Sequence, residues 1–149
     1  MLYQSLGEAV IRYGLTIWGT TNKTLLNKVE KIQNKMVMQL DPTERNVYKI
    51  YKNLNILPIP DLLQYILITD NFFSNRYKTI RNAPHDIVLR NIRKYNVPSF
   101  INAHGKRTLE HIIPKLFNKL PQNIESSETI SQLKNRLRHW LLEKYDNVM

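Results

Sequence analysis

The sequence predicts a mainly α-helical protein: a helical bundle or hairpin array of about five helices, with an irregular basic segment near residues 84–113. Three observations lead to this prediction. Apolar residues recur at three- and four-residue steps through much of the chain, as they do on one face of an α-helix. Only four of the 149 residues are glycine, too few for the many tight turns of an all-β fold. Hydrophobic residues make up 42% of the chain, enough for a buried core.

The first predicted helix covers residues 2–18. Its apolar face is formed by Leu2, Leu6, Ala9, Val10, Tyr13 and Ile17. Gly19 ends this helix, and because glycine turns at little steric cost, we expect the chain to reverse direction there. Trp18 and Tyr13 are then expected to bury their rings against the second helix.

The second and third helices follow directly. The second covers residues 23–40, and its apolar stripe is formed by Leu25, Leu26, Val29, Ile32, Met36, Val37 and Leu40. The third is expected to begin at Asp41, because Pro42 in the first turn and Glu44 at the third helical position form a frequent helix-start pattern. Its inward side chains are expected to be Val47, Ile50, Tyr51 and Leu54.

Prolines divide the next part of the chain. Pro60 begins a fourth helix, which is expected to reach about residue 79. Helical periodicity then fades until residue 113, so loops or short extended pieces are expected there, and a short helix over residues 85–95 is the alternative for part of this stretch. A short turn of helix is expected at residues 114–120.

The last predicted helix begins near Thr129, where Gln132 would complete a capping box. It is expected to bury Ile130, Leu133, Leu137, Trp140 and Leu141. The chain as a whole divides into a helical region at residues 1–83 and a basic segment with a terminal amphipathic helix at residues 84–149, or it forms one continuous domain.

Several classes of function find no support in the residue pattern. Cysteine is absent, so disulfides, zinc fingers and thiol nucleophiles are excluded. The four histidines lack a third ligand at a useful spacing, no glycine-rich phosphate loop occurs, and Glu125 and Glu128 lie in a polar turn. We therefore expect no catalytic residue, metal or cofactor. The apolar runs are too short to span a bilayer and no secretory signal is found, so we expect an intracellular protein without membrane contact.

Positive charge is concentrated in the middle of the chain. Residues 76–119 hold ten Lys or Arg residues and two acids, which gives +8 of the total net charge of +10. The ten are Arg76, Lys78, Arg81, Arg90, Arg93, Lys94, Lys106, Arg107, Lys115 and Lys119. Tyr77, Tyr95 and Phe100 lie among them. Such a stretch is typical of nucleic-acid binding through phosphate contacts and base stacking. The alternatives are a solvated surface over an aromatic core, or contact with an acidic protein or membrane surface.

An ordered series of motifs resembles a known family. The stretches "LYQSLGEAVIRYGLTIWG" and "LLNKVEKIQNKMVMQL" resemble the region just beyond the palm in non-LTR (LINE-type, jockey-like) retrotransposon reverse transcriptases. "YKNLNILPIPDLLQYI" resembles the leucine–proline segment of that family, and "PKLFNKLPQNI" with "LKNRLRHWLL" resembles its terminal N-x-L-P element and helix. The matching residues include Leu2, Tyr3, Tyr13, Gly14, Trp18, Gly19, Gln33, Asn34, Lys35, Leu57, Pro58, Asn118 and Pro121.

The resemblance implies the thumb and post-thumb part of an RNA-directed DNA polymerase from a transposable element. The catalytic palm of that family has no match here, so the chain is expected to be a fragment, a truncated element or a domesticated remnant that does not polymerise alone. It would bind an RNA–DNA hybrid in the nucleus or cytoplasm. Lys28, Lys31 and Lys35 of the second predicted helix could follow a nucleic-acid backbone, although Glu30 in the same helix partly offsets their charge.

Two other interpretations stay open at this point. The first is a helical protein–protein module without a nucleic-acid role, in which the face of Leu2, Leu6 and Val10, or the face that carries Tyr51, pairs two copies or meets a separate palm domain. The second is a translated fragment without a selected function.

Overall fold

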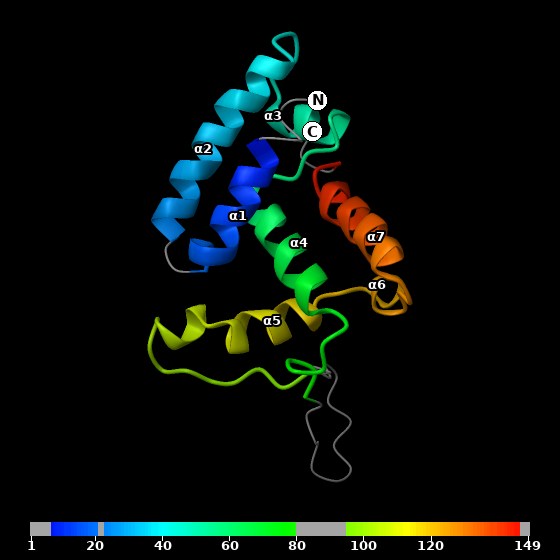
Figure 1. The fold of residues 1–149 in the computed structure, drawn as a ribbon. Helices are drawn as coiled ribbons and strands as arrows, with labels where there is room; N and C mark the ends of the chain where they lie inside the picture. The colour runs from blue at the N-terminus through cyan, green and yellow to red at the C-terminus, as the bar shows by residue number, and fades with distance from the viewer. Residues whose placement is uncertain (1–6, 21–22, 80–94, 147–149) are drawn as a thin grey trace.

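The computed structural model describes residues 7–20, 23–79 and 95–146. All regular structure in these ranges is helical, which confirms the predicted fold class (Figure 1). The elements are α1 (Glu8–Trp18), α2 (Lys23–Leu40), α3 (Val47–Asn53), α4 (Ile59–Asn71), the 3₁₀ turn η2 (Gly105–Arg107), α5 (Leu109–Phe117), α6 (Gln122–Glu125) and α7 (Ile130–Glu143). None of these helices is both long enough and apolar enough to cross a membrane.

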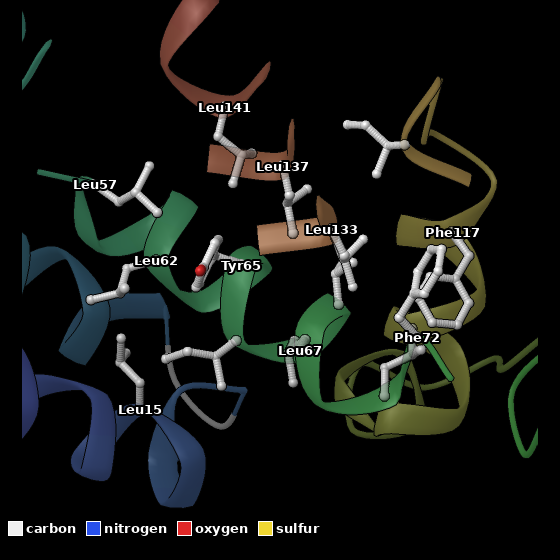
Figure 2. Packing of buried hydrophobic residues seen from close by; sticks show 14 of the residues in the cluster. Leu15, Leu57, Leu62, Tyr65, Leu67, Phe72, Phe117, Leu133, Leu137 and Leu141 are labelled. Atoms are coloured by element: carbon white, nitrogen blue, oxygen red, sulfur yellow. The ribbon is translucent and has the colours of Figure 1, made fainter. Parts of the chain in front are cut away.

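Helix α4 lies at the centre of the molecule, and α1, α2, α5 and α7 all pack against it (Figure 1). The main core joins Leu15 of α1 and Tyr65 of α4 to Phe117 of α5 and Leu137 of α7 (Figure 2). This core therefore combines residues from both sides of position 84, and the boundary placed there stays a prediction.

Helix α2 has the bounds that the sequence predicts, and one polar side chain fixes its inner face. Gln33 is 1% exposed. Its amide nitrogen donates to the carbonyl of Leu57 at 2.9 Å, and its amide oxygen accepts from the N–H of Ile59, also at 2.9 Å. Pro58 and Pro60 keep the carbonyl of Leu57 and the N–H of Ile59 out of regular helical hydrogen bonds. Gln33 provides the partners that these two backbone groups would otherwise lack. The side chain thereby joins α2 to the start of α4.

The predicted start of the third helix at Asp41 is wrong. Asp41 accepts hydrogen bonds from the N–H and hydroxyl of Thr43, and Glu44 accepts from the N–H of Asn46, so both acids stabilise a turn. These bonds lower the pKa of both carboxyls: the Thr43 hydroxyl for Asp41, and the Asn46 N–H for Glu44. Asn46 is the actual N-cap of α3, and its side chain accepts from the N–H of Tyr48. Asn46 is itself a favoured cap residue, so two start signals compete within six positions.

Helix α3 ends in a Schellman motif. The N–H of Ile56 donates to the carbonyl of Tyr51 at 2.8 Å, and the N–H of Asn55 donates to that of Lys52 at 3.0 Å. Asn55 adopts a φ of 53°, a left-handed conformation that asparagine tolerates. Around this turn lies a second, smaller core of Val37, Ile50, Tyr51 and Ile56, and the Tyr51 hydroxyl donates to Asn34 at 2.6 Å.

Helix α4 ends earlier than predicted, at Asn71 instead of residue 79. Its last turn is followed by Phe72, which packs against Phe117 with ring centroids 6.3 Å apart. A polar turn follows, in which the N–H of Ser74 donates to the carbonyl of Asn71. The contact with Phe117 holds the chain at this bend, and no sequence pattern near Phe72 indicates such a distant partner.

Helix α5 begins at Leu109, so the segment predicted as irregular up to residue 113 is shorter than expected, and the predicted start at residue 114 is wrong. Pro114 lies inside this helix, where proline removes one backbone hydrogen bond and is normally unfavourable. Ile113, Pro114 and Phe117 are all buried. The apolar burial of this face outweighs the local cost of the proline.

Helix α7 begins as predicted. The Thr129 hydroxyl accepts from the N–H of Gln132, but the Gln132 side chain accepts from the N–H of Glu128 and not of Thr129, so the capping box is incomplete. Leu133, Leu137 and Leu141 are buried as predicted, Trp140 is half-buried and Ile130 is 44% exposed. Leu142 is also buried.

The apolar face predicted for the first helix points away from the core. Leu15 is buried, whereas Val10 and Tyr13 are 73% exposed and Ile17 is 64% exposed. Helix α1 is apolar on two opposite sides, and residue spacing alone does not decide which side faces the core. Of the two aromatic residues expected to pack, Trp18 contacts the main core and Tyr13 does not. Leu2 and Leu6 lie outside the described residues.

The chain reverses between α1 and α2, as the glycine predicts (Figure 1). Gly19 has an ordinary right-handed conformation with a φ of −61°. A Cβ atom at this position would lie 2.4 Å from the carbonyl oxygen of Leu15 in α1 and 2.7 Å from Cδ1 of Leu63 in α4. Glycine is therefore needed here because the Leu15 backbone lies so close, with the Leu63 side chain beside it, and not because the turn requires an unusual backbone angle.

Candidate nucleic-acid interface

Three of the predicted binding residues share one exposed face of α2. Lys28, Lys31 and Lys35 are all exposed and lie opposite the buried positions 33 and 37. They follow one another at steps of three and four residues, so each is about one turn, roughly 5 Å, from the next. None of the ion pairs among the described residues involves them. We call these three residues the α2 lysine face.

Glu30 does not lie within this face. Each residue turns an α-helix by about 100°, which places Glu30 toward the inner side of α2. Its side chain is half-buried. The three lysines therefore present their charge to solvent with less compensation than the sequence alone suggests.

A second set of predicted binding residues follows α5. Lys106 and Arg107 are exposed on η2, Lys115 is exposed on α5, and Lys119 is exposed just after α5 ends. Along α5, Lys115 lies on the side opposite the buried Ile113, as helical spacing requires.

Two predicted binding residues are engaged within the fold. The guanidinium of Arg76 lies 3.5 Å from Glu110 and 5.2 Å from the ring centre of Tyr77. The ammonium of Lys78 lies 4.4 Å from the ring centre of Phe72. These cation–π contacts and the ion pair bind both side chains to the molecule itself, so their assignment to nucleic-acid binding stays a prediction.

Four predicted binding residues lie outside the described residues. They are Arg81, Arg90, Arg93 and Lys94. The alternative short helix at residues 85–95 also falls almost wholly in this part of the chain.

Two of the aromatic residues that lie among the basic ones, Tyr77 and Tyr95, belong to the main core, as expected if the segment forms a solvated surface over an aromatic core. Tyr77 is 7% exposed and Tyr95 is 9% exposed. The Asn118 side chain binds both backbone groups of Tyr95, at 2.8 Å and 2.9 Å. Phe100 is half-buried against His111, with ring centroids 6.0 Å apart. These rings are therefore poorly placed to stack on bases.

Two charged clusters of the fold were not expected from the sequence. In the first, Arg12 and Arg138 lie 5.5 Å and 5.3 Å from the ring centre of Tyr65. Both also pair with the buried carboxylate of Glu8, at 3.8 Å and 3.4 Å. This cluster joins α1, α4 and α7 through side chains far apart in the sequence, which local spacing does not reveal.

The second cluster surrounds Asp61, which is fully buried in the first turn of α4. Its carboxylate pairs with the ammonium of Lys144 and accepts a hydrogen bond from the Tyr145 hydroxyl. Burial of the phenol and its bond to the Asp61 carboxylate raise the pKa of Tyr145. The ring of Tyr145 stacks on Tyr48 with centroids 4.9 Å apart. The end of α7 is thus fixed to both α3 and α4.

A groove of about 490 Å³ opens beside α7. We call it the Trp140 groove; it is lined by Gln64, Lys119, Trp140, Leu141, Glu143 and Lys144. These residues come from α4, from the segment after α5 and from α7. The sequence predicts Trp140 in the core and Lys119 in the basic segment, and no residue spacing indicates that the two lie together.

In the part of the chain that the structure describes, no group of three or more His, Asp or Glu residues could hold a metal ion. Comparison of the chain with protein-family models, with curated proteins and with solved structures gives no match in any of the three. The resemblance to retrotransposon reverse transcriptases therefore depends on the ordered sequence motifs alone.

Proposed function

We propose that this chain is a non-catalytic, C-terminal part of an RNA-directed DNA polymerase of a non-LTR transposable element, and that it binds RNA and DNA through basic residues. The observation that carries the proposal is the α2 lysine face, because its three cations are exposed, aligned and without carboxylate partners among the described residues. The exposed cations of η2 and α5 add to it. Any active centre would belong to a separate palm domain.

The mechanism is electrostatic. Each lysine that neutralises a phosphate releases condensed counterions, which gives affinity without sequence preference. The core of Leu, Ile and aromatic side chains holds α2 in place, and the lysines project from its outer side. An intracellular site of action, in the nucleus or cytoplasm, follows from this role as part of the proposal.

The test measures affinity for an RNA–DNA hybrid across a salt series. We expect binding to weaken steeply as salt increases, with similar affinity for unrelated sequences. Replacing Lys28, Lys31 and Lys35 together by Gln is expected to reduce the slope of log affinity against log salt by about 2 to 3, since each lost phosphate contact removes about 0.9. Absence of binding at low salt would refute the proposal.

A matched control removes the same charge elsewhere. Lys49 and Lys52 are paired with Glu44 and Asp146, and Lys134 is exposed on α7. Replacement of these three lysines by Gln changes the net charge equally, and we expect it to leave most of the salt slope intact. An equal loss in both triple variants would show that net charge, and not the α2 lysine face, determines binding.

A second candidate function, a protein-interaction module, is favoured by the outer face of α1. Val10, Tyr13 and Ile17 are exposed there by 64% to 73%. The other exposed positions of α1, Ala9 and Thr16, are also uncharged. On a chain of net charge +10, a neutral apolar face is the one on which a second copy meets least repulsion. The face carrying Tyr51 is not available for this role, because Tyr51 is fully buried.

Light scattering distinguishes the two candidates. Pairing through α1 predicts a dimer whose population increases with protein concentration and does not require nucleic acid. A monomer at every concentration would exclude this candidate while leaving nucleic-acid binding untouched.

A further inference from the structure

We infer that the Trp140 groove holds an unstacked base of single-stranded nucleic acid, with the base on the Trp140 ring and the neighbouring phosphate at Lys119. This inference rests on the proposed function and specifies a site for it. The volume of about 490 Å³ lies within the range of small-ligand sites. Base–aromatic stacking is tolerant of sequence, which agrees with a non-specific binder.

Three lining groups retain unused capacity for binding. Trp140 packs against the main core and is half-buried, but its indole N–H has no acceptor among the described residues. The half-buried amide of Gln64 likewise has no partner there. Lys119 forms no ion pair with any described residue. An aromatic face from α7, an amide from α4 and a cation from the segment after α5 thus meet in one groove.

The two other charged groups that line the groove each contact a further side chain. The ammonium of Lys144 is bound to Asp61. Glu143 lies 3.0 Å from Nε2 of His139. Lys119 is therefore the lining cation available to a phosphate.

Duplex nucleic acid offers no free base to this groove. The rings within a duplex stack on one another, whereas a single strand can place a base on an aromatic side chain. The α2 lysine face needs only phosphates and serves either form. The two sites therefore differ in the kind of nucleic acid that they recognise.

Tryptophan fluorescence tests the inference, because the chain has only two tryptophans, Trp18 and Trp140. In the W18F variant all tryptophan emission comes from Trp140. We expect an oligothymidylate at low salt to quench roughly half or more of this emission as it stacks. A blunt duplex of the same length is the comparison, added until fluorescence anisotropy shows that the same fraction of protein is bound. This duplex is expected to quench little of the Trp140 emission.

Two further variants keep the test decisive. W140F retains Trp18 as its only tryptophan, and its emission is expected to stay unchanged when nucleic acid binds. This variant still tests the groove if circular dichroism shows that W18F is unstable. Lys119 is exposed, so its replacement is expected to leave the fold intact. We expect Lys119→Gln to weaken oligothymidylate binding more than duplex binding.

The outcomes distinguish the base-binding groove from the proposed function, general nucleic-acid binding. Quenching by the single strand but not by the duplex supports the groove. Equal quenching by both, or single-strand binding that leaves Trp140 emission unchanged, overturns the groove and leaves the proposed function standing. No anisotropy change with either nucleic acid at low salt overturns both.

Discussion

Two polar side chains satisfy backbone groups that no regular helical hydrogen bond serves. Gln33 binds the carbonyl of Leu57 and the N–H of Ile59, and Asn118 binds both backbone groups of Tyr95. Each of these side chains imitates the paired hydrogen bonds of a neighbouring strand. Gln33 and Asn118 belong to the motifs on which the family resemblance depends, and their geometry explains both as structural residues.

We expect Gln33→Met to lower the free energy of unfolding by about 2–5 kcal/mol, because two buried backbone groups lose their partners while the volume stays similar. Urea denaturation measures the change. Gln39→Met is the control, since Gln39 is exposed on the same helix and its loss is expected to have little effect. Equal effects of the two changes would contradict the role given to Gln33.

Tyr145 gives the fold a dependence on alkaline pH. Its pKa is raised by burial and by the Asp61 carboxylate, so its contribution is complete below the pKa of an unfolded tyrosine, about 10, and is lost as pH rises toward the folded value. We expect the free energy of unfolding to decrease above about pH 10. In Tyr145→Phe it should be lower by about 1–3 kcal/mol at neutral pH and should decrease less steeply in alkali.

The measurement is urea denaturation of both proteins at neutral and alkaline pH. Tyr13→Phe serves as the control because Tyr13 is exposed on α1, and it should follow the wild type throughout. An alkaline slope unchanged by Tyr145→Phe would mean that another group is responsible.

Among the helices, periodicity predicts some elements well and fails for physical reasons in others. The bounds of α2 and the start of α7 follow from the sequence because each has one continuous apolar stripe or one clear cap. The inward face of α1 does not follow from the sequence, because Leu15 and Val10 lie on two opposite apolar sides of the helix. The start of α5 does not follow from the sequence either, because a proline normally marks the beginning of a helix, whereas Pro114 lies within this one.

The outer face of α1 makes a specific prediction at this scale. Tyr13→Lys places a charge at the middle of the exposed apolar face without touching the core, so we expect the fold to persist and any concentration-dependent dimer to disappear in light scattering. Ser131→Lys adds the same charge at an exposed position of α7 and should leave the dimer in place. Loss of the dimer in both variants would indicate general charge repulsion.

Over the whole molecule, the sequence predicts the sign and the amount of charge better than its placement. The excess of +8 in residues 76–119 is visible in the chain, but the fold engages Arg76 and Lys78 internally. The three residues of the α2 lysine face are predicted from the sequence, but their position opposite the buried side of α2, away from Glu30, comes from the structure. The Trp140 groove combines α4, α7 and the segment after α5, which are distant in sequence, so no local pattern could have predicted it.

The division of the interior into two cores has a dynamic consequence. The smaller core around Tyr51 involves α3 and the end of α2, whereas α4 is buried in the larger one. Segments with few buried contacts open at lower free energy than the centre of a protein. In hydrogen–deuterium exchange, we expect the amides of α3 to exchange well before those of α4. The end of the molecule around α3 would then open locally while the rest stays folded. Identical protection of both helices would instead show a single cooperative unit.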